Sequence, residues 1–395
     1  MGTYKRICIL GNYSGRNAGD AALLAGILRE ISSRYKSVEF LVPTLNPRFV
    51  KKYCGGYRVR PVSLLPWNGC IKLLGLPVWN AMRSSDLILI TDAVLFDRGL
   101  FNPLHNYLSS LALLIPLAKK RGVPVVLYNV SLGPARAAAG QWCLRRVLNH
   151  SDLVILRDED SRRMLEVVGD VRPPVARGAD SALSAPCCSP DRIRTILQEN
   201  GVWANKRSRV GINLNDYGDS FIRNGHSHYS KAELLATLSK IAEWIVADLK
   251  ADVWLIATQH MDVKILQEFQ KTIRSKEKLP LFTNQRYSYA ELAGLFSQLD
   301  LLIGMRTHAL ILASSVGTPV VGLATYPKTY GYLHRIGQET YSISIQDVNF
   351  DKLQNLIRQN WERRSLLRQD IVQAIGRERK LAWQAADFLA PYLGG

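Results

Sequence analysis

The chain has 395 residues, of which 47% are apolar and 21% are charged. This is the composition of a globular protein with material for two hydrophobic cores, and it excludes a disordered chain, a coiled coil and a disulfide-stapled miniprotein. Lys and Arg outnumber Asp and Glu by 51 to 33, so the formal net charge is +18 and an anionic partner is favoured.

The six cysteines follow neither a metal-binding nor a disulfide spacing, so we expect reduced thiols in a cytoplasmic protein. The first residues show no secretory signal and no myristoylation pattern. The most apolar run, residues 108–118, is well below the roughly 18 residues that span a bilayer. We therefore expect no membrane-spanning segment.

Short runs rich in Val, Ile and Leu alternate with helical patterns in the first half of the chain. Strands are predicted at 6–11, 38–43, 57–63, 86–91, 124–130 and 152–157, with helices at 20–35, 105–121 and up to 168. Strands buried on both faces read as continuous apolar runs, and their alternation with helices predicts a parallel, doubly wound sheet.

A stretch rich in Pro, Ser, Cys and charge at 184–207 separates this half from a second alternating series. Strands are predicted there at 209–214, 252–258, 279–283, 299–304 and 319–324. We predict an α/β fold with two Rossmann-like domains facing a cleft, residues 1–185 and 205–350, and a helical C-terminal segment, residues 351–395. Ligands of such domains bind at the carboxyl ends of the strands.

The loop from Gly11 to Asp20 lies between the first predicted strand and the first helix. Its glycines allow backbone N–H groups to approach a ligand, and a helix N-terminus favours an anion or a hydroxyl-rich group. The spacing is not GxGxxG, so a dinucleotide site is disfavoured. The structural alternative is a tight turn with Asp20 as the helix N-cap, and the two readings are compatible.

A second candidate is the corner GMRTHAL at 304–310, between an apolar strand and an apolar helix. Arg306 has the fork geometry that binds a carboxylate or phosphate, and Thr307 is suited to cap the helix. His308 lies in the first helical turn and is able to transfer a proton at neutral pH. We interpret this corner as a functional site.

Two further cations follow predicted strands. Lys328, in the segment YPKTYG, either reaches the same site or is a solvated loop lysine. Arg157 leaves a buried strand and is a candidate ligand-binding residue, whereas Asp160 or Ser161 is expected to cap the next helix. The D-x-D of this stretch provides few oxygen ligands, so no metal site is predicted. His226 and His228 lie in a polar segment that is either an acceptor-binding loop or a surface loop.

These segments resemble the polysaccharide pyruvyl transferases. The resemblance rests on GNYSGRNAGDAALLAGIL, DLVILRDEDS and GMRTHALILASSVGTPVVGLATYPKTYG, which follow the family pattern G-N-x-G-D, R-D-x-x-S, G-M-R-x-H-A and Y-x-P-K. It covers about residues 6–335 and implies a fold similar to B-type glycosyltransferases. Family members often carry GGG-x-x-x-x-D after the fourth strand. Here Thr91–Asp97 lacks the glycines, and Asp97 retains the acid.

The resemblance implies an enzyme that transfers pyruvate from phosphoenolpyruvate, as co-substrate and without a further cofactor, to a sugar of an exopolysaccharide, capsule or cell-wall glycan. The product is a pyruvate ketal. It implies His308 and Arg306 as catalytic residues. The expected donor-binding residues are Arg306, Thr307, His308, Lys328 and Arg157, and the expected acceptor-binding residues are Arg16, Asn17, Gly19, Asp20 and Asp97.

Two alternatives remain open at this point. One is a nucleotide-sugar-dependent glycosyltransferase of the same fold. The other is a non-catalytic nucleic-acid binder, suggested by the +18 charge but opposed by the dispersed basic residues and the lack of a basic-aromatic stripe.

The C-terminal segment Trp361–Phe388 combines apolar positions with a cluster of basic side chains. One interpretation is a packed helix whose arginines form a solvated face. The other is that this basic face associates with an anionic membrane surface, at the inner face of the cell membrane, where a lipid-linked acceptor would be found.

Overall fold

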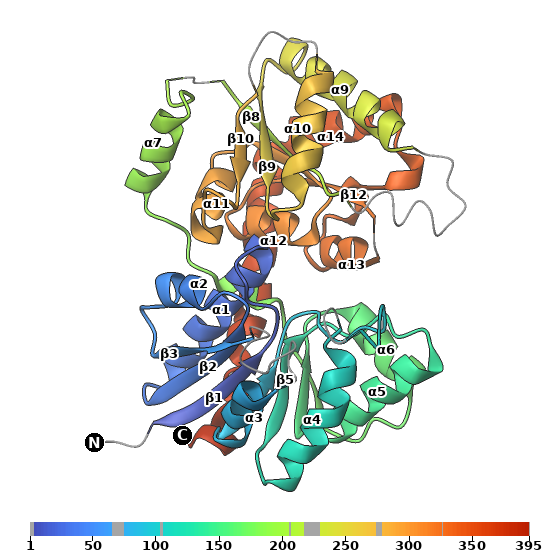
Figure 1. The fold of residues 1–395 in the computed structure, drawn as a ribbon. Helices are drawn as coiled ribbons and strands as arrows, with labels where there is room; N and C mark the ends of the chain where they lie inside the picture. Colours follow the sequence, from blue (N-terminus) through green and yellow to red (C-terminus); the bar gives the residue numbers. More distant parts are fainter. Residues whose placement is uncertain are drawn as a thin grey trace. The chain divides into compact units, whose positions relative to one another are not determined.

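A computed structural model of the protein describes residues 4–64, 75–102, 106–204, 207–216, 230–273, 279–325 and 327–394. The chain forms two compact units, each built on a parallel β-sheet flanked by helices (Figure 1). The first unit contains residues 1–15, 23–185 and 378–395, and the second contains 16–22 and 186–377. The α/β fold with two Rossmann-like units and a C-terminal helix is confirmed.

The first unit has a seven-stranded sheet in the order β3-β2-β1-β4-β5-β6-β7. The strands are β1 (Lys5–Leu10), β2 (Val38–Thr44), β3 (Val59–Ser63), β4 (Leu87–Ile90), β5 (Val125–Val130), β6 (Leu153–Leu156) and β7 (Val175–Arg177). β4 and β5 are buried along their whole length, as their continuous apolar sequences predict. The strand order reverses between β1 and β4, which is where open α/β sheets bind ligands.

The helices of the first unit follow its strands. They are α1 (Ala18–Arg34), α2 (Pro47–Tyr53), α3 (Leu76–Arg83), α4 (Leu108–Lys120), α5 (Ala138–Asn149) and α6 (Glu159–Val168). Residues of α3, α4 and α5 pack in one apolar core against β1, β4 and β5. A short 3-10 helix, η2 (Ser181–Ser184), closes the unit before the chain leaves it.

The second unit has a six-stranded sheet in the order β10-β9-β8-β11-β12-β13. The strands are β8 (Arg209–Asn213), β9 (Asp252–Ala257), β10 (Leu281–Thr283), β11 (Leu301–Gly304), β12 (Val320–Ala324) and β13 (Ser342–Ser344). Its helices are α7 (Pro190–Glu199), α9 (Lys231–Ala247), α10 (Asp262–Thr272), α11 (Tyr289–Phe296), α12 (Thr307–Ser315), α13 (Pro327–Arg335) and most of α14 (Phe350–Gln384). Strand order reverses between β8 and β11.

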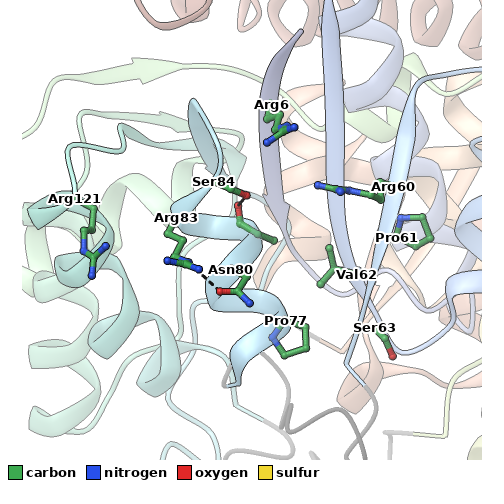
Figure 2. A pocket seen from close by; sticks show the side chains of 11 residues that line it. Arg6, Arg60, Pro61, Val62, Ser63, Pro77, Asn80, Arg83, Ser84 and Arg121 are labelled. Carbon is green, nitrogen blue, oxygen red and sulfur yellow. Dashed lines mark hydrogen bonds between the residues drawn. The ribbon is translucent and has the colours of Figure 1, made fainter. Parts of the chain in front are cut away.

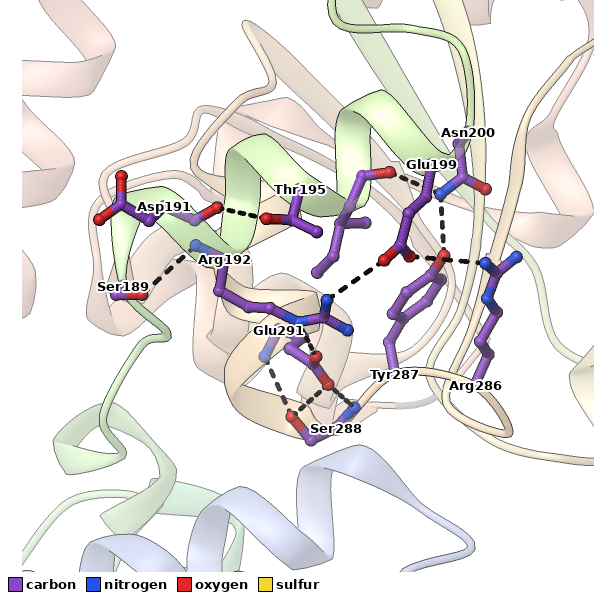
Figure 3. Close-up of polar contacts among 11 residues, drawn as sticks. Ser189, Asp191, Arg192, Thr195, Glu199, Asn200, Arg286, Tyr287, Ser288 and Glu291 are labelled. Atoms are coloured by element: carbon purple, nitrogen blue, oxygen red, sulfur yellow. Dashed lines mark hydrogen bonds and ion pairs between the residues drawn. The ribbon is translucent and has the colours of Figure 1, made fainter.

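Helix α7 comes from the stretch that the sequence analysis assigned to the domain junction, and it belongs to the second unit. Figure 3 shows how polar side chains fasten it to the segment around α11. Arg192 Nε lies 2.7 Å from Glu291 Oε1, and Asn200 Nδ2 donates to Tyr287 Oη at 2.8 Å. Glu291 also completes a capping box with Ser288, so one carboxylate both starts α11 and holds α7.

Strands β7 and β13 and helices α2, α3 and α5 are absent from the sequence-based prediction, and one segment predicted as a loop is a helix. β7 and β13 each have three residues that are not fully buried, so neither leaves an apolar run in the sequence. The segment after β12, interpreted as a loop, begins helix α13 at Pro327. Proline is well suited to the first helical position because its missing N–H is not needed there.

The C-terminal arginines of α14 largely bond within the protein. Arg368 Nη2 donates to Leu299 O at 2.8 Å, and Arg363 Nη1 to Tyr341 Oη at 3.3 Å. Arg379 Nε donates to Leu183 O at 2.8 Å in the first unit. These bonds favour the packing interpretation of this helix. Within the part of the chain that is described, no helix is long and apolar enough to cross a bilayer.

Candidate functional site

The strand-to-helix corner after β11 is formed as the sequence predicts. Arg306 N donates to Asn213 Oδ1 at 3.1 Å, which ties the corner to the end of the neighbouring strand β8. Thr307 is the first residue of α12, and the N-cap position is Arg306, without a side-chain capping bond. The expectation that Thr307 caps the helix is therefore wrong. Its hydroxyl instead lies 3.0 Å from Thr329 Oγ1 of α13.

The guanidinium of Arg306 is held by a buried carboxylate that sequence reasoning missed. Arg306 Nε and Nη2 donate to the two carboxylate oxygens of Asp262 at 2.8 and 2.5 Å. Asp262 is fully buried and the Arg306 side chain is 16% exposed. Burial raises the pKa of Asp262, while the bonds from Arg306 lower it. The Nε–Nη2 edge is thus committed to Asp262, which fixes the direction of the guanidinium.

His308 packs directly against Gly19. A Cβ atom on Gly19 would lie 2.2 Å from His308 Cγ and 2.3 Å from His308 Nδ1, so only glycine allows the ring to occupy this position. The structure therefore brings together two stretches that the sequence analysis assigned separately to acceptor and donor binding. Both belong to the second unit, because residues 16–22 are part of it.

Backbone contacts hold residues 16–18 at the carboxyl ends of β9 and β10. Arg16 O accepts from His260 N at 3.0 Å and from Asn284 Nδ2 at 2.9 Å, and Ala18 N donates to Thr258 O at 2.8 Å. Because residues 16–18 directly precede or begin α1, these bonds hold the first turn of α1 at the carboxyl end of the second sheet.

Asn17, rather than Asp20, starts helix α1. The helix begins at Ala18, and Asn17 Oδ1 accepts from Gly19 N at 2.8 Å. Asn17 Nδ2 donates to Asp20 Oδ1 at 2.9 Å. The N-cap assignment of Asp20 is wrong by one helical turn. Asp20 instead lies in the first turn, where a carboxylate is favoured by the helix dipole.

A second histidine, His260, was not identified from the sequence. Burial lowers its pKa, a hydrogen bond to the backbone of Asn284 raises it, and the charge of Arg16 lowers it further, for a net lowering. A lowered pKa favours the neutral imidazole near pH 7. The only signal in the sequence is its position just after a predicted strand.

Two asparagines after β8 have opposite environments. Both side-chain amide atoms of Asn213 are hydrogen-bonded, since Oδ1 accepts from Arg306 N and Nδ2 donates to Ile256 O at 2.8 Å. Asn215 is 1% exposed, yet neither Oδ1 nor Nδ2 has a hydrogen-bond partner among the described residues. An unsatisfied buried amide is costly, so its presence beside the point where strand order reverses indicates a polar ligand or ordered water.

Lys328 lies in the first turn of α13, directly before Thr329. Since Thr329 contacts Thr307 across the two helices, Lys328 enters at the same end of the sheet as Arg306 and His308. The prediction that it follows the carboxyl end of the next strand is confirmed, but the position is helical and not a loop.

In the first unit, the predicted site residues take part in structural contacts. Arg157 Nη1 pairs with Asp180 Oδ2 at 2.9 Å, and both side chains are at least nine-tenths buried. The cap of α6 is Asp158, whose Oδ1 accepts from Ser161 N at 2.8 Å, so the expected caps Asp160 and Ser161 are wrong.

Asp97 caps a neighbouring helix. Its Oδ2 accepts from Arg136 N at 2.6 Å and Ala137 N at 2.8 Å, directly before α5. Gly140 of α5 packs against it so closely that a Cβ would lie 2.4 Å from Asp97 Cβ. This carboxylate therefore fixes the start of α5.

Asp92, also in the first unit, differs from Asp97 in its contacts and its backbone conformation. It follows β4 at the point where the strand order reverses, it is 5% exposed, and no side-chain hydrogen bond or ion pair of Asp92 is found within the described residues. Its φ is +65°, a left-handed conformation that favours glycine. Such strain is retained at functional sites. His226 and His228 lie outside the described residues.

The second unit thus gathers an oriented guanidinium, two imidazoles and a buried amide at the carboxyl end of its sheet. Such a set is able to hold an anion, transfer a proton and bind a polar group. Sequence reasoning identified Arg306 and His308 from their motif. It missed Asp262, His260 and Asn215, because each is a single polar residue without a recognisable spacing.

Solved structures share this fold over nearly the whole chain. HepE of Anabaena in complex with UDP-glucose is 16% identical, with a TM-score of 0.62 and 99% of each chain covered. The UDP-GlcNAc 2-epimerase of Neisseria meningitidis bound to UDP-GlcNAc is 12% identical, with a TM-score of 0.60 and 98% of this chain and 99% of that chain covered. Staphylococcus aureus MnaA with UDP is 11% identical, with a TM-score of 0.59 and coverages of 98% and 95%. At these identities the likeness shows the fold alone, which is of the B-type glycosyltransferase and epimerase kind.

Sequence comparison adds the family. No match to this chain is found among curated protein sequences. The family of polysaccharide pyruvyl transferases matches residues 17–326, a range that includes the loop at Gly19, the buried Asp262 and the Arg306–His308 corner. Because this match spans most of the chain, the protein belongs to the polysaccharide pyruvyl transferase family and is a transferase of polysaccharide modification.

Proposed function

We propose that the protein transfers the pyruvyl group of phosphoenolpyruvate to two hydroxyls of one sugar, forming a pyruvate ketal and releasing phosphate. The observation that carries the proposal is the corner itself: a guanidinium fixed by Asp262 beside a histidine seated on Gly19. Phosphoenolpyruvate carries a carboxylate and a phosphate, and its reaction needs a proton donor, so this set of groups suits it.

The reaction requires that C3 of the enol phosphate gain a proton, so that C2 becomes electrophilic. One sugar hydroxyl then adds at C2 and a second displaces phosphate, which leaves with the remaining proton. We assign the C3 proton to His308 and the anion contacts to Arg306 and Lys328. Asn215 is proposed to bind a polar oxygen of the substrate, which would satisfy its buried amide.

For the acceptor we propose Asp92 as the carboxylate of the first unit, in place of Asp97. A carboxylate without side-chain partners within the described residues is suited to accept a proton from a sugar hydroxyl, whereas Asp97 already accepts two backbone N–H groups.

The test measures phosphate release from phosphoenolpyruvate with a panel of glycan acceptors, and thermal protection by phosphoenolpyruvate. We expect His308→Gln to retain protection and to lose turnover, since glutamine donates a hydrogen bond but cannot transfer a proton. Protection of the wild type by UDP and not by phosphoenolpyruvate would contradict the proposal and favour a nucleotide-sugar donor.

The two aspartates are separated by matched variants. Asp92→Gly relieves the left-handed backbone and removes the carboxylate, so we expect higher stability together with loss of acceptor-dependent phosphate release. Asp97→Asn should lower stability by about 1 kcal/mol through the weakened cap, with turnover largely kept. The reverse pattern of activities would assign the acceptor role to Asp97.

A further inference from the structure

Three successive helices of the first unit carry no carboxylate. The sequences of α3, α4 and α5 contain no Asp or Glu, but they contain the basic residues Arg83, Lys119, Lys120, Arg145 and Arg146. Ordinary surface helices mix both signs of charge. The next helix, α6, carries Glu159 and Asp160 in i,i+3 pairs with Arg162 and Arg163.

These helices lie side by side on one face of the first sheet (Figure 1). Arg146 Nε of α5 donates to Ala112 O of α4 at 2.9 Å, which joins the two helices directly. We call their solvent-exposed side the α3–α5 face. It is defined by Leu76, Arg83, Leu113, Leu117, Lys120, Arg121 and Trp142.

Large apolar side chains project from the α3–α5 face. The exposed fractions are 71% for Leu76, 56% for Leu113, 41% for Leu117 and 57% for Trp142. Leu113, Leu117 and Arg121 follow one another at intervals of four residues, so they form one stripe along α4 that ends in a cation. Apolar groups gathered on one face of a folded protein indicate an interaction site.

A hollow lined by four arginines lies at the basic end of this stripe. Figure 2 shows Arg6, Arg60, Arg83 and Arg121 around it, with α3 on one side and the strands on the other, and its volume is about 680 Å³. Arg6 is paired with Glu39 at 3.3 Å, and Arg83 Nε donates to Asn80. The side chains of Arg60 and Arg121 make no ion pair or hydrogen bond within the described ranges.

We propose that the α3–α5 face docks on an anionic phospholipid surface. Leu76, Leu113, Leu117 and Trp142 enter the interfacial region, and the arginine hollow receives a lipid phosphate. Leucine and tryptophan beside Lys and Arg, without carboxylates, are typical of protein surfaces that lie in a membrane interface. Guanidinium groups bind phosphate in a bidentate manner.

Charge selects this occupant over a second copy of the chain. A symmetric self-association through the α3–α5 face would bring two carboxylate-free basic faces together, which is electrostatically unfavourable. A soluble phosphate compound would explain the hollow but not the exposed leucines. This proposal does not depend on the pyruvyl transfer.

The experiment is sedimentation of the full chain with phosphatidylcholine vesicles that either contain or lack phosphatidylglycerol. We compare Arg83→Gln/Arg121→Gln with Arg162→Gln/Arg163→Gln on α6, which removes the same charge from exposed positions nearby. Each basic residue at a membrane surface changes binding about fivefold, so we expect the first pair to lose at least about tenfold and the second about twofold or less.

A second variant, Leu113→Ser/Leu117→Ser, tests the apolar stripe. Both side chains are exposed, so the fold is expected to be kept, as judged by thermal unfolding, while vesicle binding falls. The proposal is overturned if both arginine pairs lose vesicle binding equally, or if the serine variant binds normally. It is also overturned if the wild type does not bind anionic vesicles, or if the wild type self-associates and the serine variant does not. Thermal protection by glycerol phosphate without vesicle binding would assign the hollow to a soluble anion and also overturn it.

Discussion

Glu30 in the first unit and Asp262 in the second are both fully buried carboxylates, but their surroundings differ. Tyr128 Oη and Ser181 Oγ donate to Glu30 Oε2 at 3.0 and 2.9 Å, and burial raises the pKa of Glu30 to about 8. Asp262 faces a guanidinium, whose two bonds oppose the effect of burial. The first carboxyl is therefore neutral at pH 7, whereas the second is one half of an ion pair.

The two buried carboxyls serve different purposes in their units. Glu30 joins α1 to β5 and η2, so its contacts are internal and cross-link the core. Asp262 instead fixes a side chain at the carboxyl end of the sheet, where ligands bind. A buried charge is expensive, and its retention beside a strand-to-helix corner is explained by the orientation that it imposes on Arg306.

The largest effect is expected when the ion pair is broken. Asp262→Asn leaves the buried side of Arg306 without its counter-charge, so we expect the free energy of unfolding to fall by about 3 kcal/mol. Binding of phosphoenolpyruvate should also weaken. Glu30→Gln is the matched control, since a neutral amide replaces an acid that is neutral in the folded state. At pH 4, where the acid is largely neutral in the unfolded state too, its effect should stay within about 1 kcal/mol. Urea unfolding of both variants decides whether the two carboxyls differ as described.

A second way to test the comparison is to displace His308 without touching any charge. Gly19→Ala adds a Cβ 2.2 Å from His308 Cγ, so the ring must move. Misplacement of a reacting group by about 1 Å costs about 100-fold in rate, and we expect turnover to fall by that factor. Gly376→Ala is the control, because open space surrounds Gly376. Comparable turnover in the two variants would remove His308 from the site.

The pH dependence of stability tests the buried carboxyl of Glu30 directly. Because Glu30 has a pKa near 8 when folded and an ordinary value near 4.3 when unfolded, the unfolded state binds fewer protons between these values. The stabilising contribution is complete below about pH 4 and falls by about 1.4 kcal/mol per pH unit as the pH rises toward 8. Amide hydrogen exchange of β5 measures this for the first unit. Glu30→Gln should flatten the dependence, and an unchanged slope would exclude Glu30 as its origin.

The smallest expected effect concerns the two asparagines after β8. Asn215→Leu removes an unsatisfied buried amide, so we expect the free energy of unfolding to rise by about 1 kcal/mol while substrate binding weakens. Asn213→Leu removes two hydrogen bonds and should lower the free energy of unfolding by about 1–3 kcal/mol. A loss of stability in both variants would show that Asn215 is a structural residue like its neighbour.

Most of the fold is predictable from the sequence because its central strands are apolar on both faces. The run at 299–304 contains β11, and the run at 319–324 contains β12. The edge strands β7 and β13 are not predictable in this way, since three partly exposed residues carry no periodic signal. The start of helix α13 was predictable from the sequence, because proline favours the first position of a helix.

The candidate site is predictable only where a motif marks it. Arg306 and His308 stand out through their spacing after a buried strand. Asp262 follows β9 without such a pattern, and its role becomes visible only once the fold brings it to Arg306. Likewise, the left-handed backbone of Asp92 is a property of conformation that the sequence does not display.

The return of residues 378–394 to the first unit has a consequence for synthesis on the ribosome. Tyr35 Oη donates to Ala386 O at 3.0 Å, and Asn129 Nδ2 to Ala382 O at 3.5 Å, so this late segment supplies part of the earlier unit's interior. N-terminal domains usually fold first as the chain emerges. Here the nascent first unit must wait, with an open flank, until the second unit has been translated. We expect chains stalled before residue 378 to retain a protease-sensitive first unit.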